Sequence, residues 1–238
     1  MAITFRYLTV WLALAAAAFA PVLRADESPQ VKLHFTVFCP DQIAPGTLSY
    51  VTGPARRPRL QPLLFYPTSR SPVCEFSGAL PLRIVDSESQ GIVASVDVPA
   101  GVTEPLLILL PIHPVPTRGP RYQVILLDDS RTKHGAGGLA ILNFSGMELA
   151  GTVDRAKVQL AHGYNGPFAI GTVAQVHLQA SFRGRDYHSF GGTIEPGHGG
   201  RALLILLPPY YQGSLEVQSR LLLDEGPILE RKGGAAKS

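Results

Sequence analysis

Leu106-Leu-Ile-Leu-Leu-Pro111 is an apolar run closed by proline, and it recurs unchanged as Leu203-Leu-Ile-Leu-Leu-Pro208. The run is too short for a helix that ends so abruptly. It predicts a central β-strand that is covered on both faces and ended by the proline. The two copies lie 97 residues apart, which indicates two copies of one domain.

The repeat extends beyond these two runs in both directions. The aligned stretches keep the order strand, turn, apolar strand, proline stop and acidic-ended strand; they are residues 95–101 with 192–198 and residues 122–129 with 217–225. In the last alignment the spacing is 96, so that Asp128-Asp129 falls opposite Asp224-Glu225. Equivalent acidic pairs indicate a shared structural role, such as ending a strand and protecting a sheet edge.

Composition and periodicity favour an all-β protein. Of the 238 residues, 45% are hydrophobic and 16% charged, and 24 glycines and 21 prolines indicate many turns. Period-two alternation marks strands at residues 92–98 and 176–182. Further strands are expected at residues 32–39, 48–53, 60–66, 81–86, 121–128, 138–144, 149–153, 156–160, 190–194 and 215–223. We predict two tandem, duplicated, immunoglobulin-like β-sandwich domains after a signal peptide.

The N-terminal segment predicts export. Arg6, an apolar stretch and small residues before Asp26 form a secretory signal peptide with cleavage expected after Ala25; an uncleaved anchor is the alternative. No later stretch reaches 18 apolar residues, so the mature chain is expected to lack a transmembrane span. The expected organisation is a signal peptide at 1–25, sandwich domains at 26–135 and 136–229, and a flexible tail at 230–238.

The charge pattern argues against a nucleic-acid partner. The formal net charge is +3, and the basic residues are scattered singly or in pairs such as Arg56-Arg57 and Arg231-Lys232. The expected location is the periplasm, the cell surface or the extracellular space. The expected partner there is an envelope protein or a polysaccharide.

Two cysteines, Cys39 and Cys74, predict a disulfide in an exported chain. Cys39 shares a strand face with Phe35 and Val37, and Cys74 is in phase with Phe76. Both thiols are therefore expected to face the core of the first domain. Two buried free thiols are the alternative.

Candidate site residues lie in the second domain, and no standard catalytic signature accompanies them. The chain has no G-x-S-x-G, H-E-x-x-H, P-loop or G-x-G-x-x-G, so neither catalysis nor a cofactor is expected. His188 and His198 flank an expected hairpin beside Asp186. The alternatives for them are metal ligands, a catalytic base or simply surface loop residues. Tyr210 and Tyr211 follow two prolines on a loop, where their rings can stack on a sugar, contact a partner or pack on the core.

Part of the second half resembles exported β-sandwich proteins of environmental bacteria that have no assigned function. The resemblance rests on residues 138–145, a short strand ending near Val153, and Val158-Gln-Leu-Ala-His-Gly163. It implies fold and export, and it transfers no catalytic residue. The chain is also similar to periplasmic pilus chaperones in its two basic, immunoglobulin-like domains, but that family's paired basic residues in the interdomain cleft have no recognisable counterpart.

These observations favour a noncatalytic exported structural or binding protein of the cell envelope. One alternative is a hydrolase or metal-dependent enzyme with a site near the interdomain cleft, built from Asp186, His188 and His198. Another is a periplasmic chaperone-like protein that donates a strand to a subunit through an exposed edge.

Overall fold

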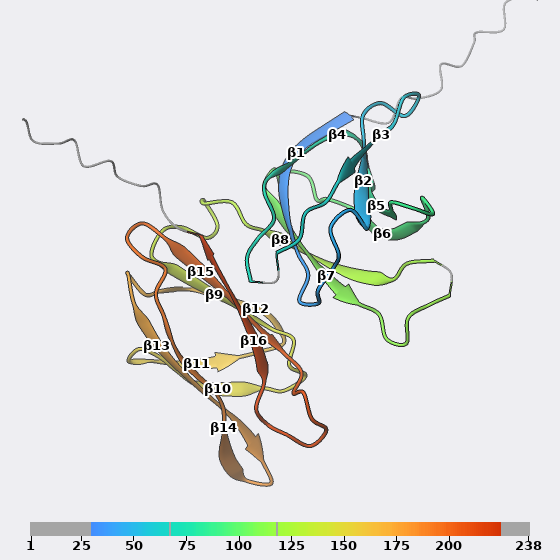
Figure 1. Cartoon of the computed structure of the whole chain (residues 1–238). Coiled ribbons are helices and arrows are strands. Elements are labelled where there is room, and N and C mark those ends of the chain that lie inside the picture. The colour runs from blue at the N-terminus through green and yellow to red at the C-terminus, as the bar shows by residue number, and fades with distance from the viewer. Residues whose placement is uncertain (1–29, 67, 118, 225–238) are drawn as a thin grey trace, which may run out of the picture.

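A computed structural model describes residues 30–224 except 67 and 118, and this part of the chain forms two β-sandwich domains (Figure 1). The predicted all-β class and the two sandwiches are confirmed. The described residues include no helix of the length and apolar character that a bilayer span requires. The signal peptide predicted at 1–25 and the tail predicted at 230–238 lie outside the described residues.

Within residues 30–224, as far as the structure describes them, each domain contains eight strands. Those of the first are β1 (Gln30–Phe38), β2 (Leu48–Thr52), β3 (Arg59–Pro62), β4 (Cys74–Ala79), β5 (Leu82–Asp86), β6 (Ile92–Val96), β7 (Pro105–Pro111) and β8 (Tyr122–Asp128). Those of the second are β9 (Gly138–Asn143), β10 (Leu149–Val153), β11 (Ala156–Leu160), β12 (Gly163–Ala169), β13 (Ala174–Phe182), β14 (Arg185–Ile194), β15 (Arg201–Leu207) and β16 (Gln218–Asp224).

The two domains have one topology. The sheets of the first domain are ordered β4-β1-β7-β8 and β3-β2-β5-β6, and those of the second β12-β9-β15-β16 and β11-β10-β13-β14. In each domain the first strand pairs in parallel with the seventh, whereas every other described pair is antiparallel. The duplicated architecture is compatible with an immunoglobulin-like sandwich, a description that covers more than one strand order.

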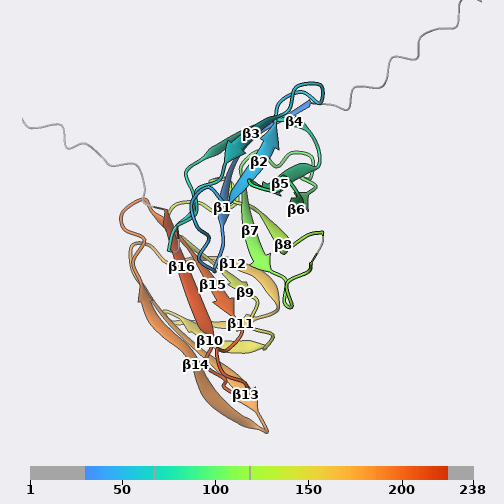
Figure 2. The ribbon, with the colours of Figure 1, turned by 45° about the vertical axis from the view of Figure 1, so that its right-hand side comes forward.

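The two apolar runs form β7 and β15, which lie inside their sheets and are covered on both faces. In β7, Leu107 and Leu109 pack in the core of the first domain, whereas Leu106 and Ile108 point toward the second domain. β15 divides its residues in the same way. The outward-pointing residues meet in the interdomain cluster, whose buried members are Phe38, Leu106, Ile108, Ala140, Leu142, Leu203, Ile205, Leu207 and Leu222. The molecule is thus a stack of four sheets, which Figure 2 shows from a second side.

Strand pairing corrects the register of the repeat in the last strand of each domain. β7 and β8 pair Leu106 with Leu127, and β15 and β16 pair Leu203 with Leu222. The last strands are therefore equivalent at a spacing of 95 rather than 96, because a shift of one residue would turn every side chain to the opposite face. Asp224 is consequently equivalent to Asp129, not to the residue before it.

Candidate functional site

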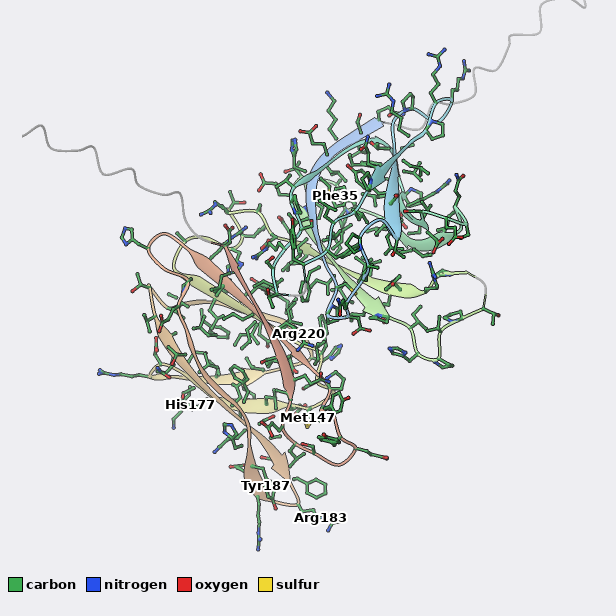
Figure 3. All side chains as sticks on the ribbon, viewed as in Figure 1. Phe35, Met147, His177, Arg183, Tyr187 and Arg220 are labelled. Carbon is green, nitrogen blue, oxygen red and sulfur yellow. The ribbon has the colours of Figure 1, made fainter. Side chains whose placement is uncertain are left out.

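Four exposed aromatic rings lie on two segments of the second domain, a strand hairpin and a loop. Phe182 and Tyr187, on the β13–β14 hairpin, are 49% and 41% exposed. Tyr210 and Tyr211, on the loop between β15 and β16, are 76% and 73% exposed. Figure 3 shows Tyr187 at the end of the second domain that lies away from the first domain. Of the alternatives that the sequence left open for the tyrosine pair, the structure has both rings exposed on the loop rather than packed on the core.

Hydrogen bonds join the β15–β16 loop to β14. The Ser189 hydroxyl donates to the Leu215 carbonyl at 2.6 Å, and the Val217 amide donates to the Ser189 carbonyl at 3.1 Å. A turn closed by the Ser214 amide on the Tyr211 carbonyl, at 3.1 Å, connects the tyrosine pair to this anchored segment. The loop is therefore held beside the β13–β14 hairpin rather than projecting freely.

Between the hairpin and the loop lies the aromatic groove, a shallow and open hollow of about 540 Å³. It is lined by Phe182, Tyr187, His188 and residues 213–216. A second hollow of about 330 Å³ shares Phe182 and Leu215 with it and continues toward β10. The aromatic groove combines ring faces with hydrogen-bonding groups, as binding sites for small ligands commonly do.

Polar and charged groups surround the rings of the hairpin. The guanidinium carbon of Arg183 lies 5.1 Å from the centroid of the Phe182 ring, within the range of a cation–π contact. The Ser181 hydroxyl donates to the Asp186 carboxylate across the β13–β14 ladder. His188 and Glu216 are both exposed, so the groove offers an imidazole and a carboxylate to a ligand.

The structure brings most of the predicted surface residues to one end of the domain and leaves His198 at the other. Asp186 and His188 lie on β14 near the loop that carries the tyrosine pair. From His188 to its end at Ile194, β14 covers about 20 Å, and His198 follows in the next loop. His188 and His198 therefore do not form a common site, and no group of three metal-ligating side chains occurs within the described ranges.

The neighbour of His188 is His177 on β13. A side chain at Gly191 would place its first carbon 2.9 Å from Cε1 of His188 and 3.5 Å from Nδ1 of His177. The two imidazoles therefore crowd the space above this glycine on the outer face of the sheet. Sequence spacing did not indicate that both imidazoles lie beside Gly191, because this arrangement depends on the pairing of β13 with β14.

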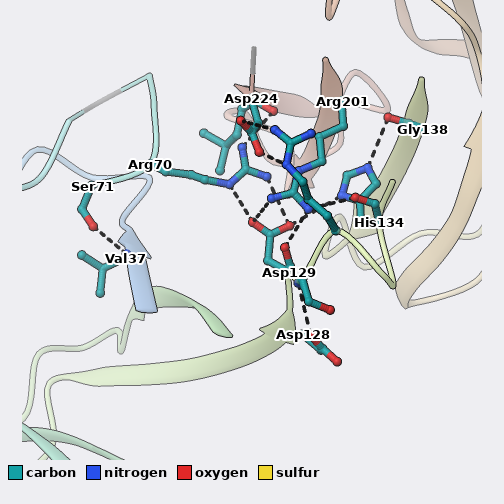
Figure 4. A network of polar contacts seen from close by, with 12 residues as sticks. Val37, Arg70, Ser71, Asp128, Asp129, His134, Gly138, Arg201 and Asp224 are labelled. Atoms are coloured by element: carbon teal, nitrogen blue, oxygen red, sulfur yellow. Dashed lines mark hydrogen bonds and ion pairs between the residues drawn. The ribbon is translucent and has the colours of Figure 1, made fainter. Parts of the chain in front are cut away.

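A buried ionic cluster, unnoticed in the sequence, joins the two domains at the start of β15 (Figure 4). We define it as Arg70, Asp129, His134, Arg201 and Asp224. Nε of Arg70 donates to Oδ2 of Asp129 at 2.8 Å, and Nε of Arg201 donates to Oδ2 of Asp224 at 2.7 Å. Nη2 of Arg201 lies 3.5 Å from Asp129, so the two arginines share this carboxylate.

Nη2 of Arg70 also donates to Asp129, to Oδ1 at 3.4 Å, and Nη1 of each arginine reaches backbone carbonyls. Nη1 of Arg201 donates to the carbonyls of Asp129 at 2.7 Å and of His134 at 2.9 Å. Nη1 of Arg70, in the first domain, donates to the Leu222 carbonyl of the second at 3.5 Å. The hollow beside the cluster measures about 520 Å³, but the guanidinium groups facing it already have anionic and carbonyl partners. The cluster therefore links the two domains through ion pairs and hydrogen bonds, and we call this link a clamp between the domains.

Asp129 is the carboxylate at the centre of the ionic cluster. Burial raises its pKa, but the adjacent His134 and the charges of Arg70 and Arg201 outweigh burial, so the pKa lies below its ordinary value. Nδ1 of His134 is 3.6 Å from Oδ1 of Asp129, which is too long for a good hydrogen bond, and this buried nitrogen has no hydrogen-bond partner among the described residues.

The predicted disulfide is wrong, although both cysteines face the core as expected. Cys39 is buried in the core of the first domain and Cys74 packs against it. Cys74 pairs with Phe35, four residues before Cys39, which places the two cysteines about 13 Å apart along the ladder. A disulfide requires Cα atoms within about 7 Å, so the structure has two free thiols, the alternative reading of the sequence.

The chain matches no protein-family model and no curated protein sequence at a significant level.

Proposed function

We propose that this protein is a noncatalytic, exported binding protein of the cell envelope that acts through the aromatic groove and the neighbouring tyrosine pair. The observation that carries the proposal is the concentration of four exposed rings on two anchored segments at one end of the second domain. Phe182 and Tyr187 line the hollow, and Tyr210 and Tyr211 lie on the loop beside it; exposed aromatic side chains of this kind are enriched in contact surfaces. The signal-peptide pattern and the low net charge support export and an envelope ligand.

The binding part is tested by co-sedimentation of the mature chain with the isolated envelope fraction of the source organism. We expect the protein to pellet with that fraction, and we expect a variant carrying both Tyr210→Ala and Tyr211→Ala to remain largely in the supernatant. Tyr66→Ala is the matched control, because Tyr66 is a 45% exposed tyrosine of the first domain. Equal pelleting of the double variant and the parent chain would refute the assignment of this surface.

Export is tested separately by expressing the full chain and fractionating the cells. Mass spectrometry of the exported material is expected to show a mature N-terminus at Asp26. A chain that stays in the cytoplasm with residues 1–25 attached would contradict the proposed location.

A further inference from the structure

We propose that the aromatic groove binds an uncharged polysaccharide, which lies between the β13–β14 hairpin and the β15–β16 loop. This inference rests on the proposed function. The groove offers the two kinds of contact that a sugar ring requires. Aromatic faces receive the apolar C–H faces of the ring, and polar groups between them receive its hydroxyls.

Three of the four exposed rings have a neighbouring side chain beside them. The guanidinium carbon of Arg183 lies 5.1 Å from the centroid of the Phe182 ring, and 49% of Phe182 is exposed. Tyr210 and Tyr211 contact each other edge to face, with centroids 5.0 Å apart and planes at 78°. Aromatic side chains lose little conformational freedom when a ligand stacks on them.

The polar lining suits hydroxyl groups. Each sugar hydroxyl both donates and accepts, so it can pair with the Glu216 carboxylate, the Ser214 hydroxyl or a nitrogen of His188. These three side chains lie in the groove together with Phe182 and Tyr187. Hydrogen-bonding groups and ring faces therefore line the same hollow.

The charges around the groove favour an uncharged ligand. Arg183 and Arg185 on the hairpin are balanced by Asp186 beside them and by Glu216 within the groove. An acidic polymer threaded past Glu216 would meet like charge there, which disfavours its binding. An uncharged chain encounters no such cost.

The size of the groove favours a sugar segment over a protein partner. A hollow of about 540 Å³ falls within the usual range for sites of small ligands, and the adjoining 330 Å³ hollow extends the path beyond Phe182. A standard protein interface buries about 800 Å² on each partner around an apolar core. The separated rings and interspersed charges here do not form such a continuous apolar patch.

The test measures binding of the mature chain to hexasaccharides of β-1,4-glucan, α-1,4-glucan, xylan, mannan and chitin, with polygalacturonate as the acidic comparison. We expect at least one uncharged glycan to bind by calorimetry and to be preferred over polygalacturonate. Tyr211→Ala and Phe182→Ala are each expected to weaken that binding about three- to tenfold. Tyr211→Phe keeps the ring and is expected to bind as the parent does, as is the control Tyr66→Ala. Unfolding midpoints establish that each variant is folded.

Different failures separate this inference from the proposed function. Groove-dependent binding of the envelope fraction without binding of any uncharged glycan would overturn the ligand class and leave the binding function standing. Groove-dependent binding of polygalacturonate in preference to every uncharged glycan would likewise overturn it. If Phe182→Ala and Tyr211→Ala bind glycans as the parent does, and the double variant Tyr210→Ala, Tyr211→Ala also pellets as the parent does, both proposals are overturned.

Discussion

Arg201 connects three parts of the chain through one side chain. It binds Asp224 in its own sheet, shares Asp129 with Arg70, and donates to two carbonyls of the segment that joins the domains. Its side chain is only 7% exposed, so these partners, rather than water, stabilise its positive charge. Such a buried network is costly to break, because removing one member leaves the others charged and unpaired.

Asp129→Asn is expected to destabilise the protein by about 3 to 5 kcal/mol. The substitution preserves shape and removes the charge that Arg70 and Arg201 share. Urea unfolding measures the change. Asp97→Asn, at an exposed position, is the control and is expected to change stability by less than about 0.5 kcal/mol. A small effect at Asp129 would show that the cluster does not clamp the domains.

The pH dependence of the same pair of proteins tests the charge directly. Because the pKa of Asp129 is depressed in the folded protein, its contribution is present above the unfolded value of about 3.9 and is lost as pH falls through the folded value. The stability difference between parent and Asp129→Asn is therefore expected to stay constant above about pH 5 and to shrink below about pH 4. A difference that is unchanged at low pH would contradict an ionic origin.

Both cysteines are expected to react as free thiols without prior reduction. Burial raises the pKa of Cys39 to about 11 and also raises that of Cys74, so alkylation of the folded protein at pH 8 is expected to be slow. Unfolding in denaturant should expose two thiols per chain to a colorimetric reagent, and a reductant should leave the melting temperature unchanged. Thiols that appear only after reduction would contradict the structure.

β7 and β15 show at the scale of the element why an apolar run need not alternate. A strand that faces its own domain core on one side and a second domain on the other has no solvent-exposed face.

The edge strand β12, in contrast, could not be recognised from its sequence. Its Gly166 and Pro167 predict a turn, but the register shift between Asn165 and Phe168 admits them at the edge of the sheet. The sequence therefore missed β12.

Ile108→Ala and Ile205→Ala are expected to destabilise the protein as much as Leu107→Ala does, by about 2 to 5 kcal/mol each. The two isoleucines lie in the interdomain cluster and Leu107 lies in the core of the first domain, but all three are fully buried. Denaturant unfolding gives the comparison, with the 44% exposed Ile92 replaced by alanine as control. If only Leu107→Ala is costly, the domains do not depend on this packing.

At the scale of the whole molecule, the two domains form one continuous apolar stack. The inner sheets pack through the interdomain cluster, and the ionic cluster closes one end of that contact. The aromatic groove lies on the second domain at the end shown by Tyr187 in Figure 3, away from this contact. A ligand can therefore bind there without separating the domains.

Separated domains are expected to self-associate. Residues 26–135 and 136–229, expressed alone, would each expose the face that forms the interdomain cluster, and large exposed apolar faces promote association. Light scattering after size exclusion should show oligomers for each piece and a monomeric full-length mature chain that unfolds in a single transition. Monomeric, fully stable single domains would argue that the contact is incidental.

The sequence by itself determined the all-β class, the duplication and the central position of the LLILLP strands, because these depend on local periodicity and on an exact repeat. Tertiary structure alone decided the free thiols, the one-residue correction of the repeat and the ionic cluster. Arg70 and Arg201 are 131 residues apart, and nothing local marks them as neighbours. The sequence indicated only some of the residues in and beside the aromatic groove. Tyr210, Tyr211 and His188 were candidates, but alternation assigned Phe182 to the core face, and only the hairpin and loop packing leaves that ring half exposed beside them.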